Sequence, residues 1–297
     1  MPADEVDAPT PELVLDAGAD LGEGPTWDAQ ARVLVWVDIM AGRVHRFDPA
    51  TGADEALEVG QPVGAAVPTT SGGLAVAASD RFCLLDPATG KTESLVEVES
   101  DLPATIMNDG KCDPAGRFWA GTKDAEGRRP LGSLYRLDAD RTLARVLADV
   151  TISNGLGWSP DLRTMYYIDS ATYGIDGFDF DRETGAVANR RRLVDIPEGW
   201  GLPDGMTVDA EGFLWVAFWG GSAVRRLAPD GRVVSMIGFP VSQVTSCAFG
   251  GDDLADLYVT TARIGLSDAQ LQAQPHAGGL FRVRSGVRGL PEHPYVG

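Results

Sequence analysis

Four acidic or amide residues recur at equivalent positions of the chain, and their side chains could bind a metal ion. They are Glu23 in LGEGPTWD, Asn108 in NDGKCDPAG, Asn154 in SNGLGWSP and Asp204 in PDGMTVDA. Each stands five residues before the Asp or Ser of a following turn. Two carboxylates and two amide oxygens form an oxygen-only set suited to calcium, magnesium or manganese, although zinc also accepts carboxylates. The pattern predicts one divalent-metal site if the fold brings these positions together.

Glycine lies close after each of these residues. It follows three of them directly (Gly24, Gly155, Gly205) and follows Asn108 after one intervening residue, at Gly110. A missing side chain there would let the chain bend and leave space for an ion or ligand. Asn or Asp before glycine is also common in ordinary turns, so one such dipeptide alone favours a turn. Four in one phase favour a shared site.

The elements that must position these residues form a unit that recurs six times. Its core is a turn rich in Asp, Pro and Gly followed by an apolar strand, as in CDPAGRFWAGT and VDAEGFLWVAF. The turns lie near Asp28, Ser71, Asp113, Pro160, Asp209 and Gly251. Their intervals are roughly 42 to 49 residues, the length of a four-stranded propeller blade. A sandwich or barrel with irregular strand spacing is the alternative, but six units in one phase argue against it.

We therefore predict an all-β protein, a six-bladed β-propeller that forms a single domain over residues 12–297. Residues 1–11 are expected to be disordered. Residues 12–16 (ELVLD) can complete the last blade beside residues 279–283 and so close the ring. Residues 267–274 can make one or two helical turns. Because the innermost strand of each blade lines the central channel, the four oxygen donors should converge there.

Composition limits the partners. The 297 residues carry a formal charge of −18, which would repel phosphate backbones and anionic lipids. The N-terminal segment is acidic where a secretory signal would be basic, and no apolar run reaches membrane-spanning length. We expect a cytoplasmic protein that acts on a small molecule, with no nucleic-acid or membrane partner, as a monomer or weak homo-oligomer.

Other catalytic machinery is sparse. The chain has no G-x-S-x-G motif, and its three histidines are not in metal-ligand spacing. A serine triad or a histidine-rich zinc site is therefore not expected. Three cysteines at unrelated spacings (Cys83, Cys112, Cys247) are predicted to be buried, reduced thiols.

The motifs together resemble the gluconolactonase family that includes regucalcin, also called senescence marker protein. The resemblance runs in order through LGEGP, NDGKCDPAGRFWAGT, ISNGLGWS, YYIDS, PDGMTVDAEGFLWVA, TSCAFGG and QPHAGGLF, nearly the whole chain. It implies a six-bladed propeller that hydrolyses a small lactone with the help of one divalent metal ion. By motif it implies the metal ligands Glu23, Asn154 and Asp204. For the substrate it implies the contact residues Asn108, Asp109, Glu126 and Ile106.

Position 106 departs from the family. The family has a sugar-binding arginine there, two residues before Asn108, and an isoleucine cannot donate the forked hydrogen bonds of a guanidinium. Recognition of sugar hydroxyls must then differ. Lys123, Arg128 and Arg129 are nearby cations, but we expect them to be solvated charges of the loop 122–132, a candidate rim or lid.

The predicted reaction is metal-assisted attack of water on a sugar-type lactone, with Asp204 as the base that accepts the proton of that water. Two alternatives use the same oxygen donors. One is a calcium-dependent hydrolase of phosphotriesters or fluorophosphates, and the other is a calcium-binding propeller without catalytic activity.

Overall fold

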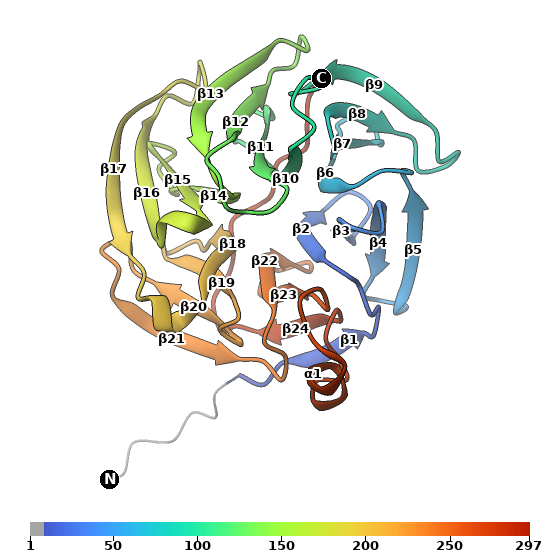
Figure 1. The fold of residues 1–297 in the computed structure, drawn as a ribbon, viewed down its shortest axis with the longest axis vertical. Helices are drawn as coiled ribbons and strands as arrows, with labels where there is room; N and C mark the ends of the chain where they lie inside the picture. Colours follow the sequence, from blue (N-terminus) through green and yellow to red (C-terminus); the bar gives the residue numbers. More distant parts are fainter. Residues whose placement is uncertain (1–8) are drawn as a thin grey trace.

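Six antiparallel four-stranded sheets surround a central channel in the computed structural model, which describes residues 9–297 (Figure 1). The predicted all-β, six-bladed, single-domain propeller is confirmed. The predicted disorder of residues 1–11 lies mostly outside the described residues and stays a prediction.

The first three blades each contain four strands that follow one another in the sequence. Blade 1 contains β2 (Gly22–Asp28), β3 (Val33–Asp38), β4 (Arg43–Asp48) and β5 (Ala53–Glu58). Blade 2 contains β6 (Val63–Pro68), β7 (Leu74–Ala78), β8 (Arg81–Leu85) and β9 (Thr92–Glu97). Blade 3 contains β10 (Thr105–Cys112), β11 (Phe118–Asp124), β12 (Gly132–Leu137) and β13 (Leu143–Val150).

The other three blades complete the ring. Blade 4 contains β14 (Ser153–Trp158), β15 (Thr164–Asp169), β16 (Gly174–Phe180) and β17 (Val187–Asp195). Blade 5 contains β18 (Leu202–Val208), β19 (Leu214–Trp219), β20 (Ala223–Leu227) and β21 (Val233–Gly238). Blade 6 contains β22 (Val244–Gly250), β23 (Asp256–Thr261), β24 (Leu280–Arg284) and β1 (Glu12–Leu15). The short helices are η1 (Ser170–Thr172), η2 (Glu198–Trp200) and α1 (Asp268–Ala273).

The ring is closed by the N-terminal strand, as predicted. β1 pairs antiparallel with β24, with Glu12 opposite Arg282 and Leu13 opposite Phe281. The first and last parts of the described chain thus share one blade, in which β1 is the outermost strand and β22 the innermost. The predicted helical segment is α1, which begins after Ser267; this serine forms a capping box with Gln270.

Turn aspartates explain why the repeat is so regular. Asp113 and Asp209 are fully buried. Each carboxylate accepts hydrogen bonds from the backbone of its turn and from the indole of a tryptophan on the next strand, Trp119 or Trp215, at 2.9 Å. One side chain therefore shapes the hairpin and fixes a large ring in the apolar layer between blades.

A β-bulge interrupts the innermost strand of every blade. The pairing register shifts near Glu23, Asn154 and Pro203, and at the same level of the three other inner strands. A bulge re-aims the side chains beside it. Because the bulge recurs at one level of the ring, the donor position of each inner strand points toward the channel.

The C-terminal segment crosses the opposite end of the channel. Behind the inner strands in Figure 1 it runs from β24 to the far side of the ring, where Tyr295 bridges Thr69 and is fully buried. On the way Glu292 forms an ion pair with Lys111 of β10 at 3.2 Å. We call residues 286–297 the strap. It closes the channel at this end.

Two further expectations concern the thiols and the membrane. Cys83, Cys112 and Cys247 are buried and unpaired with one another, as predicted. Over residues 9–297, no helix combines the length and the apolar character that crossing a membrane requires.

Candidate metal and substrate site

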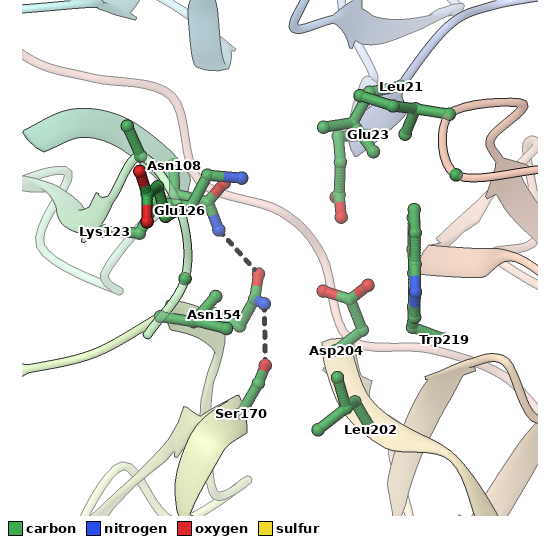
Figure 2. A pocket seen from close by; sticks show the side chains of 15 residues that line it. Leu21, Glu23, Asn108, Lys123, Glu126, Asn154, Ser170, Leu202, Asp204 and Trp219 are labelled. Carbon is green, nitrogen blue, oxygen red and sulfur yellow. Dashed lines mark hydrogen bonds between the residues drawn. The ribbon is translucent and has the colours of Figure 1, made fainter. Parts of the chain in front are cut away.

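A cavity of about 340 Å³ opens at the end of the channel opposite the strap (Figure 2). Its floor is made by the four predicted oxygen donors, which come from the innermost strands of four blades: Glu23 (β2), Asn108 (β10), Asn154 (β14) and Asp204 (β18). All four are buried, with exposures of 3 to 7%. The structure thus brings together the residues that the sequence pattern selected.

Buried carboxylates hold the chain where it enters two of these strands. Asp38 accepts hydrogen bonds from the backbone N–H groups of Asp20 and Leu21, just before Glu23. Asp169 does the same for Thr151 and Ile152, just before Asn154. The donors are therefore carried on backbone that is anchored from the neighbouring strand.

Hydrogen bonds fix the orientation of both amides. Asn108 Nδ2 donates to Ser153 O at 2.7 Å and to Asn154 Oδ1 at 3.0 Å. Asn154 Nδ2 donates to Ser170 Oγ at 2.8 Å, and that hydroxyl donates to Pro203 O at 2.6 Å. Figure 2 shows the bonds from Asn108 to Asn154 and from Asn154 to Ser170 along one side of the cavity. Because both nitrogens donate to protein oxygens, each amide can offer only its oxygen to an ion, and Asn154 Oδ1 already accepts one hydrogen bond from Asn108.

The two carboxylates of the floor carry unfavourable charge. Burial raises the pKa of Glu23 well above its ordinary value, and repulsion from Asp204 and Asp109 raises it further. Burial and Asp109 likewise raise the pKa of Asp204, which Lys123 lowers in part. A divalent cation between these oxygens would offset both costs. Among residues 9–297 no three His, Cys, Asp or Glu residues gather as a metal cluster, so the amides are needed to complete a ligand set.

Lys123 lines the cavity, contrary to the expectation of a solvated loop charge. It belongs to β11 and lies opposite Ile106 of β10. Burial lowers the pKa of its ammonium, while Asp204 and Glu23 raise it. Strand pairing thus places a cation in the cavity across from the position where the family has its arginine. The pairing register of β10 and β11 determines the place of Lys123. The presence of a lysine in the sequence does not by itself show that its side chain enters the cavity.

The loop after Lys123 forms part of the rim. Glu126 lines the cavity from an exposed position, 3.8 Å from Arg128. The other two predicted loop charges are exposed as expected, with side chains of Arg128 and Arg129 that are 80% and 55% exposed. The fully buried Asp124 accepts hydrogen bonds from the backbone of both arginines and so holds the loop in place.

Two predicted substrate contacts do not lie on the cavity wall. Ile106 is half-buried beside Lys123 on the β10–β11 hairpin, and the wall is formed by the lysine instead. Asp109 follows Asn108 in the bulge, so its carboxylate turns away and accepts a hydrogen bond from Gly110 N at 2.7 Å. Burial raises the pKa of Asp109 to about 6, against the opposing charge of Lys111. The structure therefore does not support direct contact of either residue with a substrate.

Gly24 adopts the positive φ of +52° that lets the chain bend, as predicted, but Gly155 and Gly205 have a different role. A Cβ on Gly155 would lie 2.8 Å from Asp204 O of the next blade, and one on Gly205 would meet Ser246. Gly64 faces the backbone of Asn108 in the same way. These glycines do not leave room for a ligand; they let neighbouring inner strands pack closely around the channel.

The upper wall of the cavity consists of apolar side chains that sequence reasoning missed. They are Leu21, Ile152, Leu202, Trp219 and Ile264. In the sequence these residues are far apart and have the composition of ordinary core residues. Leu21, Ile152 and Leu202 nevertheless each stand two residues before a floor donor, so the phase of the repeat could have found these three.

Comparison with known proteins identifies relatives. Residues 21–263 match the family described as the SMP-30/Gluconolactonase/LRE-like region. Regucalcin of Gallus gallus is 41% identical over 284 residues, covering 93% of this chain and 95% of that protein.

Two solved structures of proteins from this family are similar to this chain over most of its length. A calcium-binding protein, regucalcin, from Agrobacterium tumefaciens superposes with a TM-score of 0.91 at 31% identity, covering 95% of this chain and 96% of that one. A gluconolactonase from Xanthomonas campestris superposes with a TM-score of 0.75 at 25% identity, covering 93% and 89%.

Proposed function

This chain belongs to the SMP-30/gluconolactonase/LRE-like family, and we propose that it is a divalent-metal-dependent hydrolase that opens the ring of a small lactone. The observation that carries the proposal is the convergence of two buried carboxylates and two oriented amides on the floor of one cavity. The names of two relatives, a gluconolactonase and a calcium-binding regucalcin, support both the reaction and the metal.

The residues present fit a hard cation. Glu23, Asn154 and Asp204 would hold it, with Asn108 beside them, and all four offer oxygen. Calcium, magnesium, manganese and zinc are the candidate ions. A bound ion would polarise the lactone carbonyl and place positive charge beside the developing oxyanion.

The protein's own residues complete the reaction. The Asp204 carboxylate accepts a proton from the attacking water, whose oxygen forms the new bond to the carbonyl carbon. The ring C–O bond then breaks, and the same proton passes to the leaving alkoxide. Asn108, held by Ser153 O and Asn154, orients the substrate, and the Lys123 ammonium adds a further positive charge to the cavity.

Asp204→Asn tests the assignment, because asparagine keeps the shape of the side chain and removes its charge. We expect kcat to fall by at least about a thousandfold, since the base is lost and the charge of one ligand is removed. Calorimetric titration with calcium should show weaker binding. The control is Asp195→Asn, whose side chain is 92% exposed on the outer strand of blade 4. Near-normal turnover of Asp204→Asn would refute the role of this residue.

The first assay uses metal-stripped protein, a panel of lactones and each candidate ion, and it follows acid release. Absence of turnover by a folded, metal-binding protein would contradict the proposal. Phosphotriesters in the same assay then test the second kind of hydrolase, and failure of both would leave a binding protein. We also propose that the protein is a cytoplasmic monomer or weak oligomer; size-exclusion chromatography with light scattering tests its oligomeric state.

A further inference from the structure

The cavity changes character between its floor and its mouth. The floor side chains Glu23, Asn108, Asn154 and Asp204 are polar and almost fully buried. Above them lie one aromatic and four branched aliphatic side chains, Trp219 with Leu21, Ile152, Leu202 and Ile264. Most of these are only partly buried, and Ile264 is 40% exposed. Apolar surface is therefore held open to solvent at the entrance.

This apolar wall is built into the ring. Leu21 bridges Ala262, and Ile264 N donates to Asp20 O at 2.9 Å, which ties the entry to blade 1 to the loop after β23. Trp219 packs against the buried cluster that contains Leu21 and Ala262. The wall is a fixed surface and does not depend on a mobile loop.

The charged groups at the mouth lie opposite Leu21, Leu202 and Trp219, whereas Ile152 lies on their side and is bridged to Lys123. Figure 2 shows Lys123 and Glu126 beside Asn108, across the cavity from Leu21, Leu202 and Trp219. A polyhydroxylated lactone would have to place hydroxyls against the aliphatic side chains, where they lose water without gaining a partner. An indole ring accepts sugar faces as well as alkyl chains, so the aliphatic residues carry this argument.

We infer that the substrate is a lactone whose ring carries an apolar alkyl or aryl substituent. This inference rests on the proposed function. The ester group lies over the polar floor, and the substituent packs against Leu202, Trp219 and Ile264. A volume of about 340 Å³ is within the range of small-ligand pockets. Burial of apolar area then favours longer substituents over hydroxylated rings.

The test is a series of γ-lactones with 4-alkyl groups from methyl to heptyl, assayed beside aldonolactones with the metal-loaded enzyme. Each buried methylene should raise kcat/KM by about three- to fourfold until the cavity is filled. Binding of 3-alkylcyclopentanones, which cannot be hydrolysed, is measured by calorimetry and should show the same trend. This second readout does not depend on turnover.

Matched variants locate the effect. Ile264→Asn should reduce the preference for heptyl over methyl by at least fivefold. Met236→Asn is the control, because Met236 is 55% exposed on the outer strand β21, away from the cavity.

The outcomes separate the two proposals. Faster hydrolysis of aldonolactones, with no gain along the alkyl series, would overturn the inference and leave the lactonase standing. No hydrolysis of any lactone with any ion would overturn both.

Discussion

Asp109 offers a quantitative test of the electrostatics below the cavity. Its carboxylate is 6% exposed, and burial raises its pKa from the ordinary 3.8 to about 6. The folded protein then binds this proton more tightly than the unfolded chain does, so stability is lost as pH rises from 3.8 through 6. The difference corresponds to about 3 kcal/mol at pH 8, at 1.36 kcal/mol for each pH unit. Asp109→Asn removes this cost and keeps the oxygen that accepts from Gly110 N.

We expect the metal-free variant to be more stable than the metal-free parent by about 3 kcal/mol at pH 8. This corresponds to a melting temperature about 6 °C higher, at roughly 2 °C per kcal/mol for a chain of this length. The advantage should fall to about half at pH 5, where Asp109 of the parent is largely protonated. Differential scanning calorimetry in chelator at both pH values measures it, with Asp195→Asn as the control.

A melting temperature at pH 8 that is unchanged or lower would refute the reasoning. The same variant tests the predicted substrate contact. Because Asp109 does not line the cavity, KM should change by less than about twofold. A large rise in KM would restore the role that the resemblance implies.

Three other predictions concern the cavity and the core. Metal at one hundred times its Kd should stabilise the protein by about 2.7 kcal/mol in thermal melts, and Glu23→Gln should lose most of this gain. Lys123→Met should tighten metal binding by roughly five- to tenfold in calorimetry, since an ammonium no longer repels the cation, whereas Lys123→Arg should not. Burial raises the pKa of Cys83 to about 11 and of Cys247 to about 12, so iodoacetamide at pH 8 should leave both thiols unmodified in the folded protein and alkylate them in guanidinium.

The metal-site candidates could be found from the sequence because equivalent positions of the repeated unit occupy equivalent places around the ring. Glu23, Asn154 and Asp204 occupy one phase of a six-fold unit, and the unit repeats in the fold with the same bulge. Closure by β1 was also predictable, since a ring requires a fourth strand in the last blade.

Part of the cavity above the floor could not be predicted in the same way. Lys123 enters it through its register with Ile106, and Trp219 and Ile264 meet there through contacts between blades 5 and 6 and the entry to blade 1. Lys123 and Trp219 share a phase of the repeat, since each follows a donor by 15 residues, but Asp38 and Asp169 at the same phase of blades 1 and 4 do not line the cavity. The prediction that Gly155 and Gly205 leave space for a ligand failed because the atoms that would contact a side chain there belong to the next blade.

Because the strap covers one end of the channel, a ligand can enter and leave the cavity only at the other end. Between the strap and the inner strands remains a space of about 50 Å³, lined by Lys111, Leu290 and Glu292 among others, which is too small for a lactone. In the proposed reaction, the hydroxy acid that ring opening produces must therefore leave through the opening by which the next lactone arrives. Occupancy by one excludes the other, so the acid should act as a competitive inhibitor, and progress curves should slow before the lactone is exhausted.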